Sequence, residues 1–286
     1  MALIHPKNVR DLIAPTVVVA LDAWVDAGAA STLAVKELAD ETEPVVATFD
    51  SDVIYDYRAR RPTLEIMDGR PSNLAWPDLT FRRTRIGERD LLVLSGPEPD
   101  FRWRELADDL ALFARQVEVE QWISLGAIPA AVPHTRPVPV LGTESAPGLL
   151  RGDIAPGPQG LLRVPSAAIS VFDIAVAEAG IPALGYYAQI PHYINGEYPP
   201  AAIALIEAVA RHLDVEIDVE ELREESEQMR NRLNTATALD EKTRSYVERL
   251  EEMVDEARLP AGDELISEIE RFLRDRGSEP GHGQIH

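Results

Sequence analysis

The stretch that decides the fold is Thr16-Val-Val-Val-Ala-Leu-Asp-Ala-Trp-Val-Asp-Ala-Gly28. Its first six residues form a short, nearly continuous apolar run, which is typical of a strand buried on both faces of a sheet. A segment with acidic, aromatic and glycine residues follows at once, and apolar residues at helical spacing come next. Strand, loop and helix in this order indicate an open α/β sheet, in which sites are built from loops at the carboxyl ends of strands.

The same order recurs along the chain. Apolar runs predict further strands at 44–49, 91–94, 121–125, 138–143 and 183–190. Helical spacing follows three of the strands, at 103–117, 166–179 and 199–213. Alternating residues at 63–67 and 79–85 predict two half-exposed antiparallel strands around a turn at 68–73. The sequence therefore predicts an α/β fold whose sheet is mixed but mostly parallel, with helices on both faces.

The chain changes character at about Val215. No strand pattern follows, acidic residues outnumber basic ones about two to one, and narrow apolar stripes predict helices over 219–233, 246–257 and 265–272. Such stripes cannot form a core alone, so we expect this helical appendage to dock on the α/β body or on another subunit. The predicted organisation is an α/β domain at 1–214, a helical C-terminal region at 215–276 and a disordered tail at 277–286.

Composition narrows the class of protein. The 286 residues carry 28 basic and 49 acidic side chains, and this net charge of −21 disfavours nucleic acids and anionic membrane surfaces as partners. The chain has no cysteine, so disulfides and thiolate chemistry are excluded. No apolar run approaches the ~20 residues that span a bilayer, and the first residues do not have the pattern of a signal peptide. We expect a soluble, cytoplasmic protein.

The strand ends supply the candidate pocket. Four loops that follow predicted strands carry acidic, aromatic, histidine and arginine residues, which meet at one edge of an α/β sheet. The candidate pocket residues are Asp22, Trp24, Asp26, Glu98, Asp100, Trp103, His134, Arg136, His192 and Tyr193.

Each candidate has two interpretations. Asp22 and Asp26 could form a carboxylate pair, or Asp26 could simply cap the helix that follows, as Asp100 and Ser166 could cap theirs. Glu98 could act with Asp100 in acid–base chemistry, or both could stabilise a rigid turn beside a helix N-terminus.

The histidines are open to two interpretations as well. His134 and His192 could be metal ligands completed by Asp22 or Glu98, or an acid and a base. The commoner role is structural, because proline residues bracket each histidine and an imidazole can satisfy nearby backbone groups. No two candidates share metal-ligand spacing on one element. Arg136 is the best anion contact, although pairing with an acidic residue is commoner. Dinucleotide, P-loop, nucleophile-elbow and zinc-protease motifs are absent. We therefore predict no metal and no cofactor, and we assign no catalytic residue.

Several segments, in order along nearly the whole chain, carry a resemblance to a known family. They are Leu21-Asp-Ala-Trp-Val-Asp-Ala-Gly28, Pro97-Glu-Pro-Asp100 with Trp103, Val132-Pro-His-Thr-Arg-Pro137, Ile190-Pro-His-Tyr193 with Tyr198-Pro-Pro-Ala-Ala202, and Gly262-Asp-Glu-Leu265 with Glu270-Arg-Phe-Leu-Arg274. The chain resembles the bacterial branch of the proteasome assembly chaperone 2 family. The resemblance implies a phosphorylase/hydrolase-like α/β sandwich with a helical C-terminal region, and self-association, with a homotrimer favoured.

Two functional hypotheses follow. The first is a non-enzymatic assembly or interaction protein, with the chain itself and proteasome-related proteins as candidate partners. The alternative is a hydrolase or phosphorylase-like enzyme that binds a small molecule at the carboxyl ends of the strands. Some archaeal relatives dock on the proteasome through a C-terminal hydrophobic-Tyr-any tail. This chain ends Gln284-Ile-His286, with Ile at the Tyr position, so docking through the tail is not predicted.

Overall fold

The computed structural model describes residues 2–7, 9–154, 156–158 and 160–258. The chain divides into two units, residues 1–236 and residues 237–286. The predicted last helix at 265–272, the tail at 277–286 and the final Gln284-Ile-His286 lie outside the described residues. The predicted boundary at 214/215 stays a prediction; it falls between the last helix of the α/β pattern, which ends at Leu213, and the next helix, which begins at Glu220.

The first unit is built on an eight-stranded sheet. In spatial order the strands are β1 (Ile4–Pro6), β3 (Val45–Phe49), β6 (Thr80–Ile86), β7 (Arg89–Pro97), β2 (Thr16–Asp22), β8 (Gln121–Ala130), β10 (Ala183–Pro191) and β9 (Val140–Glu144). The four strands β7, β2, β8 and β10 are parallel, and the other neighbours pair antiparallel. Two antiparallel steps separate β3 from β7, so five of the eight strands run in one direction. The predicted fold class is confirmed.

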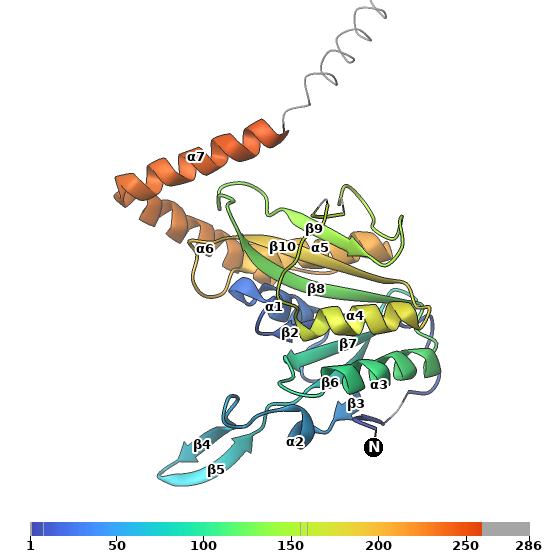
Figure 1. Ribbon diagram of the computed structural model, residues 1–286. Coiled ribbons are helices and arrows are strands. Elements are labelled where there is room, and N and C mark those ends of the chain that lie inside the picture. Colours follow the sequence, from blue (N-terminus) through green and yellow to red (C-terminus); the bar gives the residue numbers. More distant parts are fainter. Residues whose placement is uncertain (1, 8, 155, 159, 259–286) are drawn as a thin grey trace, which may run out of the picture. The chain divides into compact units, whose positions relative to one another are not determined.

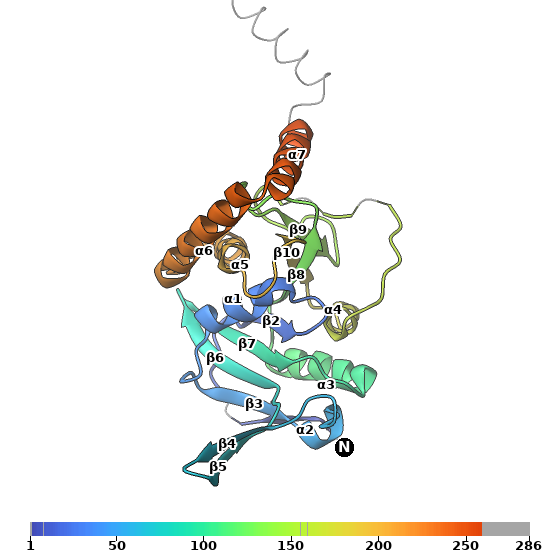
Figure 2. The same ribbon diagram turned by 90° about the vertical axis from the view of Figure 1, so that its left-hand side faces the viewer.

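Helices cover both faces of this sheet, which explains the continuous apolar run of β2. Val17 and Val19 pack with helices α3 (Trp103–Gln116) and α4 (Ala168–Glu178), whereas Val18 packs on the opposite face with α1 (Ala30–Leu38) and α5 (Pro199–Leu213). Both faces of the strand are therefore buried and both must be apolar. Figure 2 shows these helix pairs on the two sides of the sheet. Two short elements, η1 (Ala27–Ala29) and α2 (Ser51–Ile54), lie in the loops after β2 and β3.

The C-terminal helices follow the predicted stripes. In α6 (Glu220–Leu239), Leu222 and Ser226 are buried, and Leu222 packs with the α1 and α5 side of the core. The first predicted helix of the appendage therefore docks on the α/β body. The second unit contains α7 (Glu241–Arg258), which begins as expected because Asp240 Oδ2 accepts a hydrogen bond of 2.9 Å from the backbone N–H of Thr243.

The antiparallel segment differs from the prediction. β4 (Thr63–Met67) pairs with β5 (Arg70–Ala75), and residues 80–86 instead join the main sheet between β3 and β7 as β6. The predicted six-residue turn at 68–73 is wrong, because Asp68 and Gly69 alone make the turn, with φ of +50° and +76°. Positive φ at both central residues is the geometry that Asp-Gly favours in tight hairpins. Figures 1 and 2 show this hairpin, here called the arm (residues 63–75), projecting from the sheet.

Two predicted helix caps are also wrong. Asp100 does not cap α3, because its side chain accepts a hydrogen bond of 2.9 Å from the backbone N–H of Asp56 and pairs with Arg60. Ser166 does not cap α4 either, since its hydroxyl donates to the carbonyl of Ala167. Asp100 is engaged by a loop distant in sequence, and the first N–H groups of α4 receive an acid from a distant segment, Glu98, which local capping rules do not anticipate.

Candidate functional site

The loops that the sequence singled out all lie at the carboxyl ends of the parallel strands. β7, β2, β8 and β10 are neighbouring parallel strands, and each loop follows the carboxyl end of one of them. Open α/β sheets bind their ligands at the carboxyl ends of the strands. The side chains nevertheless form three separate groups, each with its own local partners.

The group after β2 serves the start of α1. Asp26 is buried and accepts hydrogen bonds from the backbone N–H of Ser31 at 2.7 Å and from its hydroxyl at 2.6 Å. Its other carboxylate oxygen accepts a hydrogen bond from the hydroxyl of Thr32. Asp22 and Trp24 are exposed, and Trp24 is 64% accessible. Asp26 therefore acts as a helix-start acceptor, and Asp22 does not share its environment.

The group after β7 ties three loops together. Glu98 is buried and accepts a hydrogen bond of 2.6 Å from the backbone N–H of Ala168, so this acid from β7 occupies the N-terminus of α4. A carboxylate there is favoured by the exposed N–H groups and the helix dipole. Asp100 holds the loop after α2, and the indole N–H of Trp103 donates to the carbonyl of Pro99 at 2.6 Å. These contacts join the loop after β7 to the loop after α2 and to the start of α4, so Glu98, Asp100 and Trp103 have a structural role.

The group after β8 and β10 centres on His134. The hydroxyl of Tyr193 accepts a hydrogen bond of 2.8 Å from the backbone N–H of His134 and lies 2.8 Å from its Nδ1. On the other side of the ring, Nε2 lies 3.3 Å from the amide oxygen of Asn234 on α6. If Tyr193 donates to Nδ1, the ring proton stands on Nε2 and donates to Asn234, so all three groups are satisfied. His192 is exposed, with Nδ1 at 3.0 Å from the carbonyl oxygen of Ala130.

Two of these residues line a cavity. His134 and Arg136 face a space of about 340 Å³ between α5 and α6, here called the α6 pocket. Its charged walls combine three arginines and two glutamates, namely Arg136, Arg223, Arg230, Glu207 and Glu227. Volumes of this order are found for small-molecule sites. The other predicted residues stay outside this cavity.

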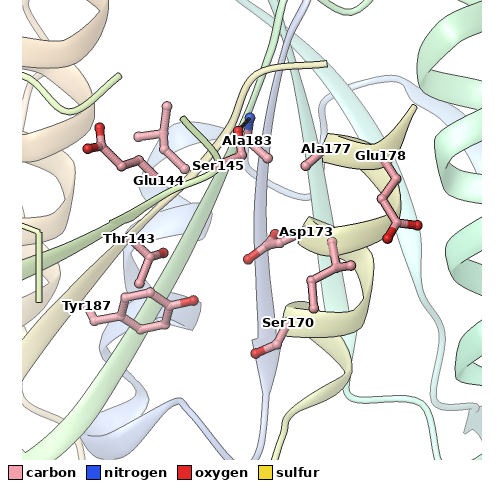
Figure 3. A pocket seen from close by; sticks show the side chains of 11 residues that line it. Thr143, Glu144, Ser145, Ser170, Asp173, Ala177, Glu178, Ala183 and Tyr187 are labelled. Atoms are coloured by element: carbon pink, nitrogen blue, oxygen red, sulfur yellow. Dashed lines mark hydrogen bonds between the residues drawn. The ribbon is translucent and has the colours of Figure 1, made fainter. Parts of the chain in front are cut away.

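A larger groove, which the sequence did not indicate, lies at the other end of the strands. Helix α4 covers β8, but β10 and the edge strand β9 extend beyond it, and a space of about 400 Å³ remains between the helix and these two strands. This α4 groove is mainly apolar, and Ile174, Ala177, Ala183 and Leu184 contribute to its walls. Figure 3 shows the side chains of Asp173, Tyr187, Thr143 and Ser170 turned toward the common space, whereas Glu144 and Glu178 point away from it.

Asp173 is the most perturbed acid at this groove. Its Oδ1 accepts hydrogen bonds from the indole N–H of Trp122, at 2.9 Å, and from the hydroxyl of Ser124, both on β8. Burial raises the pKa of the Asp173 carboxyl to about 7, because desolvation of the charged form outweighs these two hydrogen bonds. A carboxyl group that titrates near neutral pH inside a groove is a recognised marker of a functional site.

Tyr187 forms the floor of the groove beside this acid. A Cβ atom placed on Gly126 or on Gly185 would lie 2.7 Å from the ring of Tyr187, so only glycine at both positions allows the ring to lie across the sheet. Burial, together with the nearby charge of Asp173, raises the pKa of the Tyr187 hydroxyl, which therefore remains a hydrogen-bond donor.

Sequence reasoning missed the α4 groove because its parts are far apart in the chain. The register that places Gly126 beside Tyr187 is a property of the β8–β10 pairing. One local signal was present: Asp173 lies in the middle of α4 beside the apolar stripe Ile169, Phe172 and Val176, whereas the other acid of this helix, Glu178, is its last residue. An acid at such a position has to find buried partners or an unusual pKa.

Two further observations concern the described residues. Within residues 2–258, apart from the three undescribed positions, no group of three or more His, Asp and Glu side chains is arranged to hold a metal ion. A search of the same residues found no helix with the length and hydrophobicity needed to cross a membrane.

Comparison with known proteins places the chain in a family. Residues 20–237 match the model of the PAC2 family, and the chain belongs to this family. This confirms the resemblance found in the sequence. A search of the curated proteins found no match.

Solved structures of similar proteins agree with this assignment. A proteasome-assembly chaperone homologue from Mycobacterium tuberculosis is 33% identical over 81% of this chain and 99% of its own, with a TM-score of 0.74. A PAC2 family protein from Streptomyces avermitilis is 33% identical over 82% of this chain and 99% of its own, with a TM-score of 0.73. A protein of unknown function from Corynebacterium glutamicum is 27% identical over 94% of this chain and 99% of its own, with a TM-score of 0.81.

Proposed function

We propose that this protein is a non-enzymatic, chaperone-like assembly protein that associates with itself and with proteasome-related proteins. Membership of the PAC2 family carries the proposal, together with the 33% identity to a proteasome-assembly chaperone homologue over most of both chains. A function of this kind depends on surfaces that bind other proteins, and the structure offers one.

We assign this binding role to the arm. Every residue of β4 and β5 is exposed, and Leu64 lies directly opposite Leu74 across the hairpin. Ile66 is also exposed, and at the base of the arm the exposed Trp76 packs edge-on against Tyr57. A two-stranded hairpin is at best marginally stable in water, and contiguous apolar residues on a surface mark an interaction site. The arm therefore supports a role in protein association.

The predicted site residues support the same proposal. Asp26, Glu98 and Asp100 each accept hydrogen bonds from backbone N–H groups, and these bonds fix the starts of α1 and α4 and the loop after α2. Acids that hold loops in this way have a structural role. They are the three acids of the predicted pocket with hydrogen bonds of this kind, and an acid held in this way is not available for acid–base chemistry, which supports the non-enzymatic proposal.

Self-association as a homotrimer is the form that we favour. Closed rings satisfy every copy of an interface, and salt at physiological strength screens exposed charges over about 8 Å, which limits the opposition from a net charge of −21. Light scattering coupled to gel filtration tests this. We expect about three times the chain mass of 31.5 kDa, and the single-chain mass across micromolar concentrations would contradict self-association.

The partner is tested with purified components. Proteasome α and β subunits from the same organism are mixed with the full-length protein and analysed by gel filtration and native mass spectrometry. We expect a complex that contains the α subunits, or ring assembly that is faster with the protein than without it. Unchanged assembly kinetics together with no co-elution would contradict the chaperone-like role, even if the protein is trimeric.

The alternative function, a small-molecule enzyme at the strand ends, has one observation in its favour: His134 and Arg136 line the α6 pocket. Adenosine with inorganic phosphate is a suitable probe pair for a phosphorylase-like site. Stabilisation of the wild type but not of Arg136→Ala in a thermal-shift assay would favour the enzyme. Equal melting temperatures with and without both probes would count against it.

A further inference from the structure

The α4 groove has features that association with proteins does not explain. It is a space of about 400 Å³ on a sheet edge, with apolar walls and polar groups on its floor. A concave, mainly apolar space with a few convergent polar groups is the usual form of a small-molecule site. The polar groups therefore determine which class of ligand fits.

The two oxygens of Asp173 are used differently. Oδ1 is held by Trp122 and Ser124, so the orientation of the carboxyl is fixed from β8. Oδ2 has no hydrogen-bond partner among the described residues, yet every fully buried polar side-chain atom of those residues has one. Oδ2 must therefore be open to the groove, in agreement with the direction of the side chain in Figure 3.

The charges around this oxygen have one sign. The titratable side chains that line the groove are Asp173 and Glu178 on α4, Glu144 on β9 and Tyr187 on β10. Trp122 and Ser124, which face Asp173 from β8, are uncharged. None of the described lining residues is Lys, Arg or His. A carboxylate in such a place is costly unless a cation joins it.

We propose that the α4 groove binds a small organic cation, with an ammonium group at Asp173 Oδ2 and an apolar body against Ile174, Ala177 and Leu184. A hydrogen bond between an ammonium group and a carboxylate is charge-assisted and about twice as strong as a neutral one. The aromatic ring of Tyr187 on the floor suits a cation in addition. Gly126 and Gly185 leave the space in which this ring lies, so the floor of the groove is already formed without a ligand.

Binding of this kind depends on pH in a defined direction. The pKa of the Asp173 carboxyl is about 7, so the acid is mostly protonated below neutrality and mostly ionised above it. An ammonium ligand requires the ionised form. For a group with this pKa, the ionised fraction falls about 30-fold between about pH 8 and about pH 5.5, and the affinity should fall by a similar factor.

Phenethylamine and phenethyl alcohol are the matched probes for the full chain. They share one apolar body, but only the amine is a cation. Titration calorimetry or ligand-detected NMR at about pH 8 should show saturable binding of the amine at least tenfold tighter than binding of the alcohol. Asp173→Asn should abolish this preference, whereas the matched change Asp108→Asn, at an exposed acid on α3 outside the groove, should retain it.

Three results would overturn the proposal. They are equal affinity for amine and alcohol, an amine affinity in the wild type that does not fall with pH, and no saturable binding of the amine up to about 10 mM. The pH series uses the wild type alone, so the inference remains testable even if Asp173→Asn does not fold. The trimer mass is measured on the same sample, and a trimer that binds no amine would refute the groove without touching the proposed function.

Discussion

Substitution of the arm's apolar residues should weaken self-association without destabilising the subunit. The variant carries Leu64→Ser, Ile66→Ser and Leu74→Ser together. These side chains are 49%, 64% and 43% exposed, so in a single subunit they contribute little to the core. In an assembly that covers the arm, this exposed area becomes buried. The substitutions then remove most of what this area contributes to the free energy of association.

The magnitude follows from the exposed fractions. Together they correspond to about one and a half fully exposed aliphatic side chains, and complete burial of one such side chain is worth about 2 kcal/mol. The loss is therefore about 3 kcal/mol for each arm that is covered. At 1.4 kcal/mol for each factor of ten, the dissociation constant should rise about 100-fold.

Sedimentation velocity over a dilution series gives this constant directly. The control is Leu112→Ser on α3, because Leu112 is similarly exposed, at 55%, but lies outside the arm. We expect the control to match the wild type and the arm variant to dissociate at about 100-fold higher concentration. An arm variant with the wild-type dissociation constant would refute the assignment of the arm to the interface.

Three further predictions concern single titratable groups. Asp26→Ala should lower the free energy of unfolding in urea by about 2–3 kcal/mol, since Ser31 loses a buried acceptor, whereas Asp22→Ala should stay within about 0.5 kcal/mol of the wild type. The raised pKa of the Asp173 carboxyl gives a contribution to stability that is complete below its ordinary value of 3.8 and is lost as the pH rises to about 7. The stability of Asp173→Asn relative to the wild type should therefore increase from pH 3.8 to about pH 7, and an equal difference at both ends of this interval would contradict this. Burial lowers the pKa of His212 from 6.5 to about 4, so its contribution is complete above pH 6.5 and lost as the pH falls through that interval, and urea titrations of His212→Gln should show a flatter profile there.

The strands, and the place where the loops after them meet, could be predicted because they depend on local patterns. The apolar run at residues 16–21 and the helical stripe of α3 each carry enough information in consecutive residues to fix element type and buried face. Because four such strands are parallel neighbours, their loops necessarily meet at one edge. The arm was misjudged at its turn, although the Asp68-Gly69 pair was visible in the sequence, and in its second strand, because residues 70–75 pair with residues 63–67 and residues 80–86 join the main sheet.

The roles of individual side chains could not be predicted, because their partners come from distant segments. Glu98 reaches the N-terminus of α4, 70 residues away in sequence, so Ser166 beside that helix was credited with the wrong role. Asp173 takes its partners from β8, about 50 residues earlier. Local capping rules place an acid near a helix start, but the docking of helices on the sheet decides which acid is used.

The sheet order separates the two surfaces that the protein offers. The arm lies between α2 and β6 in the sequence, next to the side of the sheet formed by β1 and β3. The α4 groove lies on the opposite side of the sheet, at β10 and β9. The parallel strands β7, β2 and β8 lie between them. Within one subunit, substitutions at the arm and at Asp173 therefore have no shared contacts, and effects of such separated sites on its stability add independently. The arm variant can for this reason be used to test association and Asp173→Asn to test ligand binding.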